Sequence, residues 1–523
     1  MQGSRASTAQ LGRWRCDDMH LILALTLLAP PAGPYVPLTP ADHAGAPSFG
    51  AHEPVVGTHF FYWYKQSVGE HWIDHDGTDA LTDHPLYRGE DYAYDSEEWW
   101  VRQIAKVREA GLDFMALVYW GMPGMDDSDH PVATGLSWSN VGARTLSKIL
   151  ERQLAAGEEV LPVGMFYDTT TLRYNYKDRQ VPLDTDWGRQ WFYETIRDFY
   201  SMIPPRAWAR IDGDPIVILY GSAYAASQDD DLFQYVERRF EDDFGTGVHI
   251  IKNHGWPGDA DDIISWGGAL GLKLNTTAAV GPGYDHSAVP GREPLVVERE
   301  GGDFYVRNWE DLLSRHPRVR PTLVMVETWN ELHEGTEVEP TIEYGHQYVY
   351  LTKHYADLWR EVAYLPPEGP YTDAEVITWE PLESRGVDVP DVADGPVRKA
   401  YLDGRLCLTT DPTRPGEFLY VDAHRSFAFD QPATPVKVEL TYWDDGYREA
   451  WIEYDSLDPD SSVRAGAFKR GPALPPSTGE GWRTVTFEID DMRFGDRCNG
   501  ADMRLAMEGS APALSEARVR RVR

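Results

Sequence analysis

Residues 321–336 read PTLVMVETWNELHEGT, and the fold and the function of the chain are best approached from this stretch. Its first half is apolar and β-prone, which predicts a buried strand, and its second half predicts the loop that leaves that strand. This loop holds two carboxylates three positions apart, Glu331 and Glu334. Such a pair can supply general acid and general base chemistry to one substrate. Glutamates three apart also occur on solvated helical faces, but the neighbouring Trp329, Asn330, His333 and Gly335 do not fit such a face.

Upstream of this stretch, short apolar runs alternate with amphipathic helical patterns from residue 55 onward. Strands are predicted at residues 55–64, 113–120, 160–167, 215–220, 248–252 and 322–328, with two more between residues 263 and 284. Helices are predicted at residues 96–110, 141–156, 187–202, 231–244, 309–314 and 344–362. This alternation predicts an α/β fold, most simply a closed (β/α)8 TIM barrel. A doubly wound open sheet is the second choice, although no G-x-G-x-x-G follows the first strand.

The pattern changes at residues 366–370, which read PPEGP. Beyond them, short β-prone runs at residues 418–421, 436–443, 448–454 and 483–489 are separated by Asp, Gly and Pro turns. These runs predict an all-β sandwich, either a jelly-roll module that binds carbohydrate or one that only packs on the barrel. The predicted organisation is a leader at residues 1–33, a linker at 34–52, the barrel at 53–365, a second linker at 366–382 and the sandwich at 383–523.

The composition limits the classes of partner. A formal net charge of −35 disfavours nucleic acid and anionic membrane surfaces, because phosphate binding needs clustered Lys and Arg. The 19 Trp and 28 Tyr residues offer flat faces on which sugar rings stack, although many aromatic residues fill cores. We therefore expect a polysaccharide or oligosaccharide partner and a monomeric protein. No organic cofactor is predicted.

The N-terminus has the features of an export signal. Residues 21–29 read LILALTLLA, an apolar run too short to span a bilayer, and Pro30 and Pro31 follow it. We expect a secreted or periplasmic protein, with no membrane segment in the mature form. Cys407 and Cys498 either form one disulfide or remain two buried thiols.

The carboxyl ends of the predicted strands carry side chains suited to sugar binding, and catalytic residues of a TIM barrel lie at these ends. Aromatic, amide, histidine and carboxylate side chains recur there, as a sugar cleft requires. The predicted substrate-binding residues are Tyr62, Trp63, Tyr64, Trp120, Asp168, Asn253, His254, Trp256, Tyr284, Asp285, Trp329, Asn330 and His333.

The motif of residues 330–336, NELHEGT, resembles the Asn-Glu-Trp-His-Glu-Gly-Thr signature of the family 99 endo-α-mannosidase-like glycoside hydrolases and related bacterial barrels. Residues 61–64 and 282–285 resemble the aromatic first strand and the late loop of that family, and the resemblance covers about residues 55–362. It implies retaining hydrolysis assisted by the 2-hydroxyl of the substrate, with Glu331 as the base and Glu334 as the acid and later base. This chain has Leu332 where the family has Trp, which puts the mannoside specificity in doubt. An inverting or a conventional retaining route stays open, because the carboxylate separation decides between them.

Two alternatives to a glycoside hydrolase stay open. One is a glycan-binding protein without turnover. The other is a metal-dependent hydrolase centred on residues 71–79, HWIDHDGTD, whose oxygen and imidazole ligands suit a divalent ion. We predict no metal site, since an acidic loop is more often simply solvated. Arg292 and Arg299 are expected to form salt bridges rather than to hold an anionic sugar.

Overall fold

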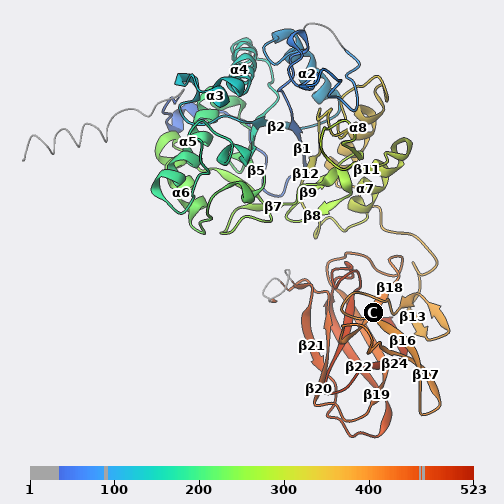
Figure 1. Ribbon diagram of the computed structural model, residues 1–523. Coiled ribbons are helices and arrows are strands. Elements are labelled where there is room, and N and C mark those ends of the chain that lie inside the picture. The colour runs from blue at the N-terminus through green and yellow to red at the C-terminus, as the bar shows by residue number, and fades with distance from the viewer. Residues whose placement is uncertain (1–34, 88–91, 459–460, 462–465, 523) are drawn as a thin grey trace, which may run out of the picture.

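The structure is a computed structural model that describes residues 35–87, 92–458, 461 and 466–522. The predicted leader at residues 1–33 lies outside these residues. Figure 1 shows a barrel of strands surrounded by helices and, beside it, a separate all-β unit. Within the described residues, no helix is long and apolar enough to cross a membrane.

Eight parallel strands form the barrel, and their order follows the chain. They are β1 (Val55–Phe60), β2 (Phe114–Tyr119), β3 (Val163–Tyr167), β5 (Asp214–Leu219), β6 (His249–Asn253), β7 (Asp262–Ile264), β9 (Thr277–Val280) and β12 (Leu323–Val326). The parallel strands have the order β7-β6-β5-β3-β2-β1-β12-β9, and the first and last of them, β7 and β9, are neighbours. This circular arrangement is a TIM-like barrel, so the alternative of an open doubly wound sheet is wrong.

Among the described residues, six helices cover the barrel. They are α2 (Glu97–Glu109), α4 (Trp138–Ala156), α5 (Asp186–Met202), α6 (Leu232–Phe244), α7 (Asp303–Leu313) and α8 (Gln347–Arg360), with a short α3 (Pro131–Gly135) before α4. Ser96 caps α2, because its hydroxyl accepts from the Trp99 amide. No α-helix follows β6 or β7, both of which lie wholly within the described residues, so the barrel departs from a regular eightfold repeat.

Minor strands decorate the barrel. They are β4 (Arg210–Ile211), β8 (Lys273–Leu274), β10 (Tyr284–Asp285) and β11 (Val296–Val297). β10 and β11 pair antiparallel and form a hairpin between β9 and α7. Residues 34–52 were predicted as a linker, and the described part, residues 35–52, packs on the barrel, where Leu38 donates its amide to the Asp243 carbonyl. The first strand is shorter than predicted and ends at Phe60, which leaves residues 61–64 in a loop at the barrel rim.

The C-terminal unit consists of two sheets packed on a separate apolar core. One sheet contains β13 (Val376–Glu380), β14 (Glu383–Arg385), β16 (Val397–Leu402), β17 (Arg405–Thr410), β19 (Thr434–Asp444), β22 (Gly481–Met492) and β24 (Ala513–Arg521). The other contains β15 (Val387–Asp388), β18 (Phe418–Ala423), β20 (Glu449–Tyr454), β21 (Lys469–Ala473) and β23 (Met503–Glu508). β13 lies inside the segment predicted as a linker. It pairs with β24, and the alternating burial of its side chains places Ile377 and Trp379 in the core of the sandwich.

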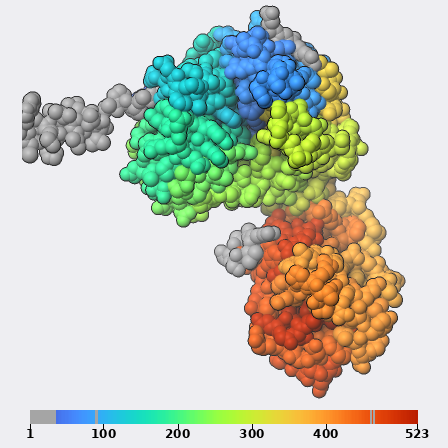
Figure 2. Space-filling view, in the orientation of Figure 1, coloured from blue at the N-terminus to red at the C-terminus, as the bar shows by residue number. Residues whose placement is uncertain are grey.

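Ionic contacts join the two units, which Figure 2 shows as two masses that touch. Arg315, just after α7, lies 2.7 Å from the fully buried Asp430 of the sandwich. Arg425 reaches Asp311 of α7 at 2.9 Å. Cys407 and Cys498 are both buried and unbonded to each other, so the disulfide alternative is wrong.

Candidate active site

The loop after β12 is fixed to the exit of β1 by hydrogen bonds that satisfy its polar groups. The Asn330 side chain accepts from the Phe61 amide at 2.8 Å and donates to the Phe61 carbonyl at 2.6 Å. The Tyr64 hydroxyl donates to the Asn330 carbonyl and accepts from the Leu332 amide. Because these groups are buried, their loss would leave polar atoms unpaired at a cost of about 1–3 kcal/mol each. Glu331 and Glu334 therefore stand on a rigid loop.

A cavity of about 380 Å³ opens at the carboxyl ends of the barrel strands. Both glutamates line it, together with Trp63, Trp120, Asp168 and His333 from the predicted set. The cavity is also lined by residues that were not predicted to bind substrate, namely Phe61, His71, Asp74, Ala80, Phe166, Thr170, Tyr220, Tyr224, Trp266, Val289, Pro290 and Arg292. Aromatic faces with a few polar groups are typical of small-molecule sites of this size.

Glu331 is 3% exposed and forms a tight pair with His333. Its Oε1 accepts from the His333 backbone amide at 3.1 Å and lies 2.8 Å from His333 Nδ1. Its Oε2 is buried and has no hydrogen-bond partner among the described residues. Burial raises the pKa of Glu331, and the charge and hydrogen bonds of His333 oppose that rise.

Glu334 lies nearer to solvent, with 22% of its side chain exposed. Its Oε1 accepts from Arg292 Nη1 at 2.7 Å, and half of the Arg292 side chain is exposed. Its backbone carbonyl accepts from the Asp285 amide, which anchors the loop to β10. Burial and the nearby Glu334 carboxylate raise the pKa of Tyr284. The two acids thus share one cavity but have different partners and different exposure.

Polar atoms without partners occur on the cavity wall. Asp74 Oδ2, like Glu331 Oε2, is buried and lacks a hydrogen-bond partner within the described part of the chain. Asp168, in contrast, accepts from Trp120 Nε1 at 2.8 Å and from the Thr170 amide, and burial raises its pKa. A hydroxyl-rich ligand could donate hydrogen bonds to these two carboxylate oxygens. Without such a donor, each buried oxygen stays unsatisfied at a cost in free energy.

Several predicted binding residues support the site without lining it. Tyr62 packs on Trp100 and Trp138 and donates to the Ser139 carbonyl. Trp329 is fully buried and donates to Gln103. Trp256 is buried and donates to the Tyr220 carbonyl. The others that do not line the cavity are Tyr64, Asn253, His254, Tyr284, Asp285 and Asn330. Leu332, the departure from the family motif, is also buried away from the cavity.

The aromatic residues of the cavity that were not predicted come from a strand interior and from the segment between β7 and β9. Phe166 of β3 stacks on Trp266, with ring centroids 5.3 Å apart and an interplanar angle of 8°. Trp266 lies just after β7, where no regular helix guided the prediction. Glu327 holds this segment, because its Oε2 accepts from the amides of Gly267 and Gly268. The alternation of side chains along β3 was the signal that could have identified Phe166.

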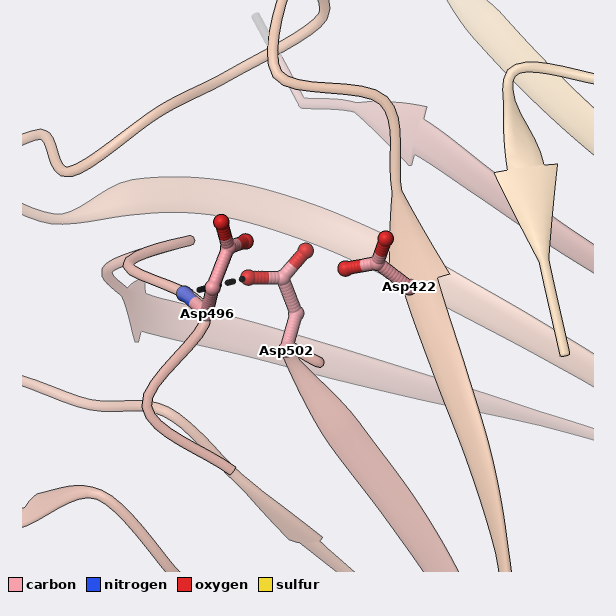
Figure 3. A group of neighbouring side chains, drawn as sticks. All are labelled: Asp422, Asp496 and Asp502. Atoms are coloured by element: carbon pink, nitrogen blue, oxygen red, sulfur yellow. Dashed lines mark hydrogen bonds between the residues drawn. The ribbon is translucent and has the colours of Figure 1, made fainter. Parts of the chain in front are cut away.

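The candidate metal loop at residues 71–79 does not gather its ligands. His71 stacks on Trp63, Asp76 accepts from Thr78, and Asp79 pairs with His84. In the described residues, the group that could hold a metal ion is instead Asp422, Asp496 and Asp502 of the sandwich, shown in Figure 3. Burial and Asp496 raise the pKa of Asp422 to about 7, and Arg425 pairs with Asp496 at 2.8 Å.

Comparison with known proteins gives one family and several weak structural similarities. No curated protein sequence matches the chain. An endo-alpha-mannosidase of family GH99 from Bacteroides thetaiotaomicron is 17% identical and covers 60% of this chain and 99% of its own, with a TM-score of 0.42. An alpha-L-fucosidase from Vibrio sp. strain EJY3 is 9% identical and covers 90% of this chain and 96% of its own, with a TM-score of 0.34.

A carbohydrate binding module from Cellvibrio mixtus lichenase 5A is 9% identical and covers 28% of this chain and 97% of its own, with a TM-score of 0.15. At these scores the similarities assign no activity to this chain. A family model described as a domain of unknown function (DUF5010) matches residues 51–370, which is more than half of the chain. The chain therefore belongs to this family.

Proposed function

We propose that this protein is a glycoside hydrolase that cleaves a polysaccharide or oligosaccharide in the barrel cavity. The observation that carries the proposal is that Glu331 and Glu334 line one cavity walled by aromatic rings. Indole and phenol faces suit the apolar faces of sugar rings, and paired carboxylates suit acid and base work on a glycosidic bond.

The two acids have environments that favour different roles. Glu331 is buried and fixed by His333, which suits a base that acts on a hydroxyl of the bound sugar. Glu334 is more exposed, which suits an acid that serves the leaving group and later a water molecule. The resemblance of residues 330–336 to the family 99 signature supports the same division of roles. The Arg292 contact must open before Glu334 can carry a proton to the leaving oxygen.

The competing function is glycan binding without turnover. Binding without turnover would be favoured if the two glutamates pointed away from the cavity, but both line it. The test is to incubate the purified protein with a panel of neutral, acidic and amino-sugar polysaccharides and to separate the products by size. We expect new reducing ends from at least one class, and none with the Glu331→Gln/Glu334→Gln double variant. Binding without products across the panel would favour the competing function.

A further inference from the structure

His333 is placed so that both of its ring nitrogens face hydrogen-bond acceptors. Nδ1 lies 2.8 Å from Glu331 Oε1, and Nε2 lies 3.0 Å from the backbone carbonyl of His71. A carbonyl oxygen can only accept, so Nε2 carries a hydrogen. A hydrogen on Nδ1 as well makes the ring an imidazolium and completes an ion pair with the Glu331 carboxylate.

The His71 carbonyl is held in place by an unusual backbone conformation. His71 has a φ of 52°, in the left-handed region that residues other than glycine seldom adopt. Its ring stacks on Trp63, with centroids 4.8 Å apart and an interplanar angle of 4°. Burial lowers the pKa of His71 to about 3, so that this ring is neutral. The local structure thus distinguishes two adjacent histidines.

The groups that face His333 favour its cation. Burial opposes the charge, but Glu331, the His71 carbonyl and Glu334 outweigh it and raise the pKa of His333. His71, the cation that could oppose it, is uncharged, and Tyr64, which stacks on the ring, is neutral because burial and Glu331 raise its pKa. Arg292 pairs with Glu334 rather than with Glu331.

We infer that His333 is a positioning residue whose positive charge keeps Glu331 ionised and directs the unpaired Oε2 of Glu331 to a hydroxyl of the bound sugar. The inference rests on the proposed function of the cavity. Two donors from His333 occupy Oε1, so that the carboxylate cannot rotate without breaking both bonds. The remaining oxygen has no partner among the described residues, as a base that awaits its substrate requires.

The charge state is tested without any substrate, by nitrogen NMR of protein labelled in histidine. His333→Asn identifies the His333 signals and keeps an amide donor near the Nδ1 position without the charge. We expect both ring nitrogens of His333 to be protonated at pH 7.5, and His71 to be neutral. Glu331→Gln should make His333 neutral at that pH. A neutral His333 in the wild type would overturn the inference whatever the activity.

The role is tested by the pH dependence of kcat/KM on the best substrate of the panel. Without the cation, buried Glu331 should ionise at higher pH, so we expect the acidic limb of His333→Asn to move up by at least one pH unit. His354→Asn, on the exposed face of α8, is the matched control and should leave the profile unchanged. An unmoved limb in an active His333→Asn enzyme would overturn the positioning role alone. Absence of hydrolysis with a charged His333 would contradict the proposed function and, with it, the positioning role.

Discussion

Two clusters of carboxylates in the described part of the chain differ in their surroundings. At the barrel rim, Glu331 and Glu334 each have a basic partner of their own, His333 and Arg292, and line a cavity with aromatic walls. In the sandwich, Asp422, Asp496 and Asp502 lie within 4.8 Å of one another, and Arg425 pairs with Asp496. Proximity alone therefore does not define an active site. In the barrel the two acids also have separate partners, different burial and a shared cavity, and these are the features on which we base the proposed active site.

The largest expected effect contrasts the two clusters directly. Glu331→Gln and Glu334→Gln should each lower kcat by about 10²–10⁴-fold, because general acid and base groups contribute on that scale. Asp422→Asn removes one carboxylate from the cluster in the sandwich and should leave kcat unchanged. Product release by the three variants, with circular dichroism as the folding control, checks this. Loss of activity in Asp422→Asn alone would reverse the assignment of the two clusters.

The second-largest expected effect is a loss of stability when a buried ion pair of the barrel is broken. Arg299 is buried, contacts Glu337 at 2.6 Å and Asp83 at 3.2 Å, and donates to the Gly335 carbonyl in the loop after β12. Arg299→Met should destabilise the barrel by about 3–5 kcal/mol, since it leaves buried carboxylates uncompensated. Arg307→Met, which breaks the exposed pair with Glu300, should cost much less, because water and salt screen an exposed ion pair. Urea unfolding of both variants measures the difference, and equal losses would show that burial of the network contributes nothing.

A smaller effect tests the aromatic walls. Trp120→Ala should raise KM for a soluble oligosaccharide by about two- to tenfold, the scale of one aromatic contact. Trp443→Ala removes a ring of the sandwich that packs against Trp482 and should leave that KM unchanged. Steady-state kinetics of the two variants separate the cavity from the sandwich as the site of substrate contact. An unchanged KM in Trp120→Ala would count against the cavity.

The smallest effect is the pH dependence of the sandwich. The folded-state pKa of Asp422, about 7, lies above the value of 3.8 for a free side chain, so the folded state binds this proton more tightly. The resulting stability is complete below about pH 3.8 and is lost as the pH rises towards 7. Asp422→Asn cannot lose a proton, so its Tm should gain on the wild type between pH 5 and pH 8. A difference in Tm that does not vary with pH would contradict this.

The sequence predicted the barrel well because strand and helix periodicities are local properties. Strands such as β2 and β3 have the predicted C-terminal ends within one residue. The cavity was predicted less completely, because adjacent residues at a strand end point to opposite sides. Of residues 62–64, Trp63 lines the cavity, whereas Tyr62 and Tyr64 are fully buried and donate hydrogen bonds to α4 and to the loop after β12. Arg292 and Trp266 share the cavity with the glutamates because the fold brings together segments that are distant in the sequence. No local sequence pattern predicts this.

We propose that a glycan binds in the barrel cavity between Glu331 and Glu334. A crystal structure of the Glu331→Gln variant soaked with an oligosaccharide that the wild type cleaves tests it most directly. We predict a glycosidic oxygen within hydrogen-bond reach of Glu334 and a sugar ring against Trp63 or Trp120. An oligosaccharide bound only to the sandwich, with the barrel cavity empty, would contradict the claim.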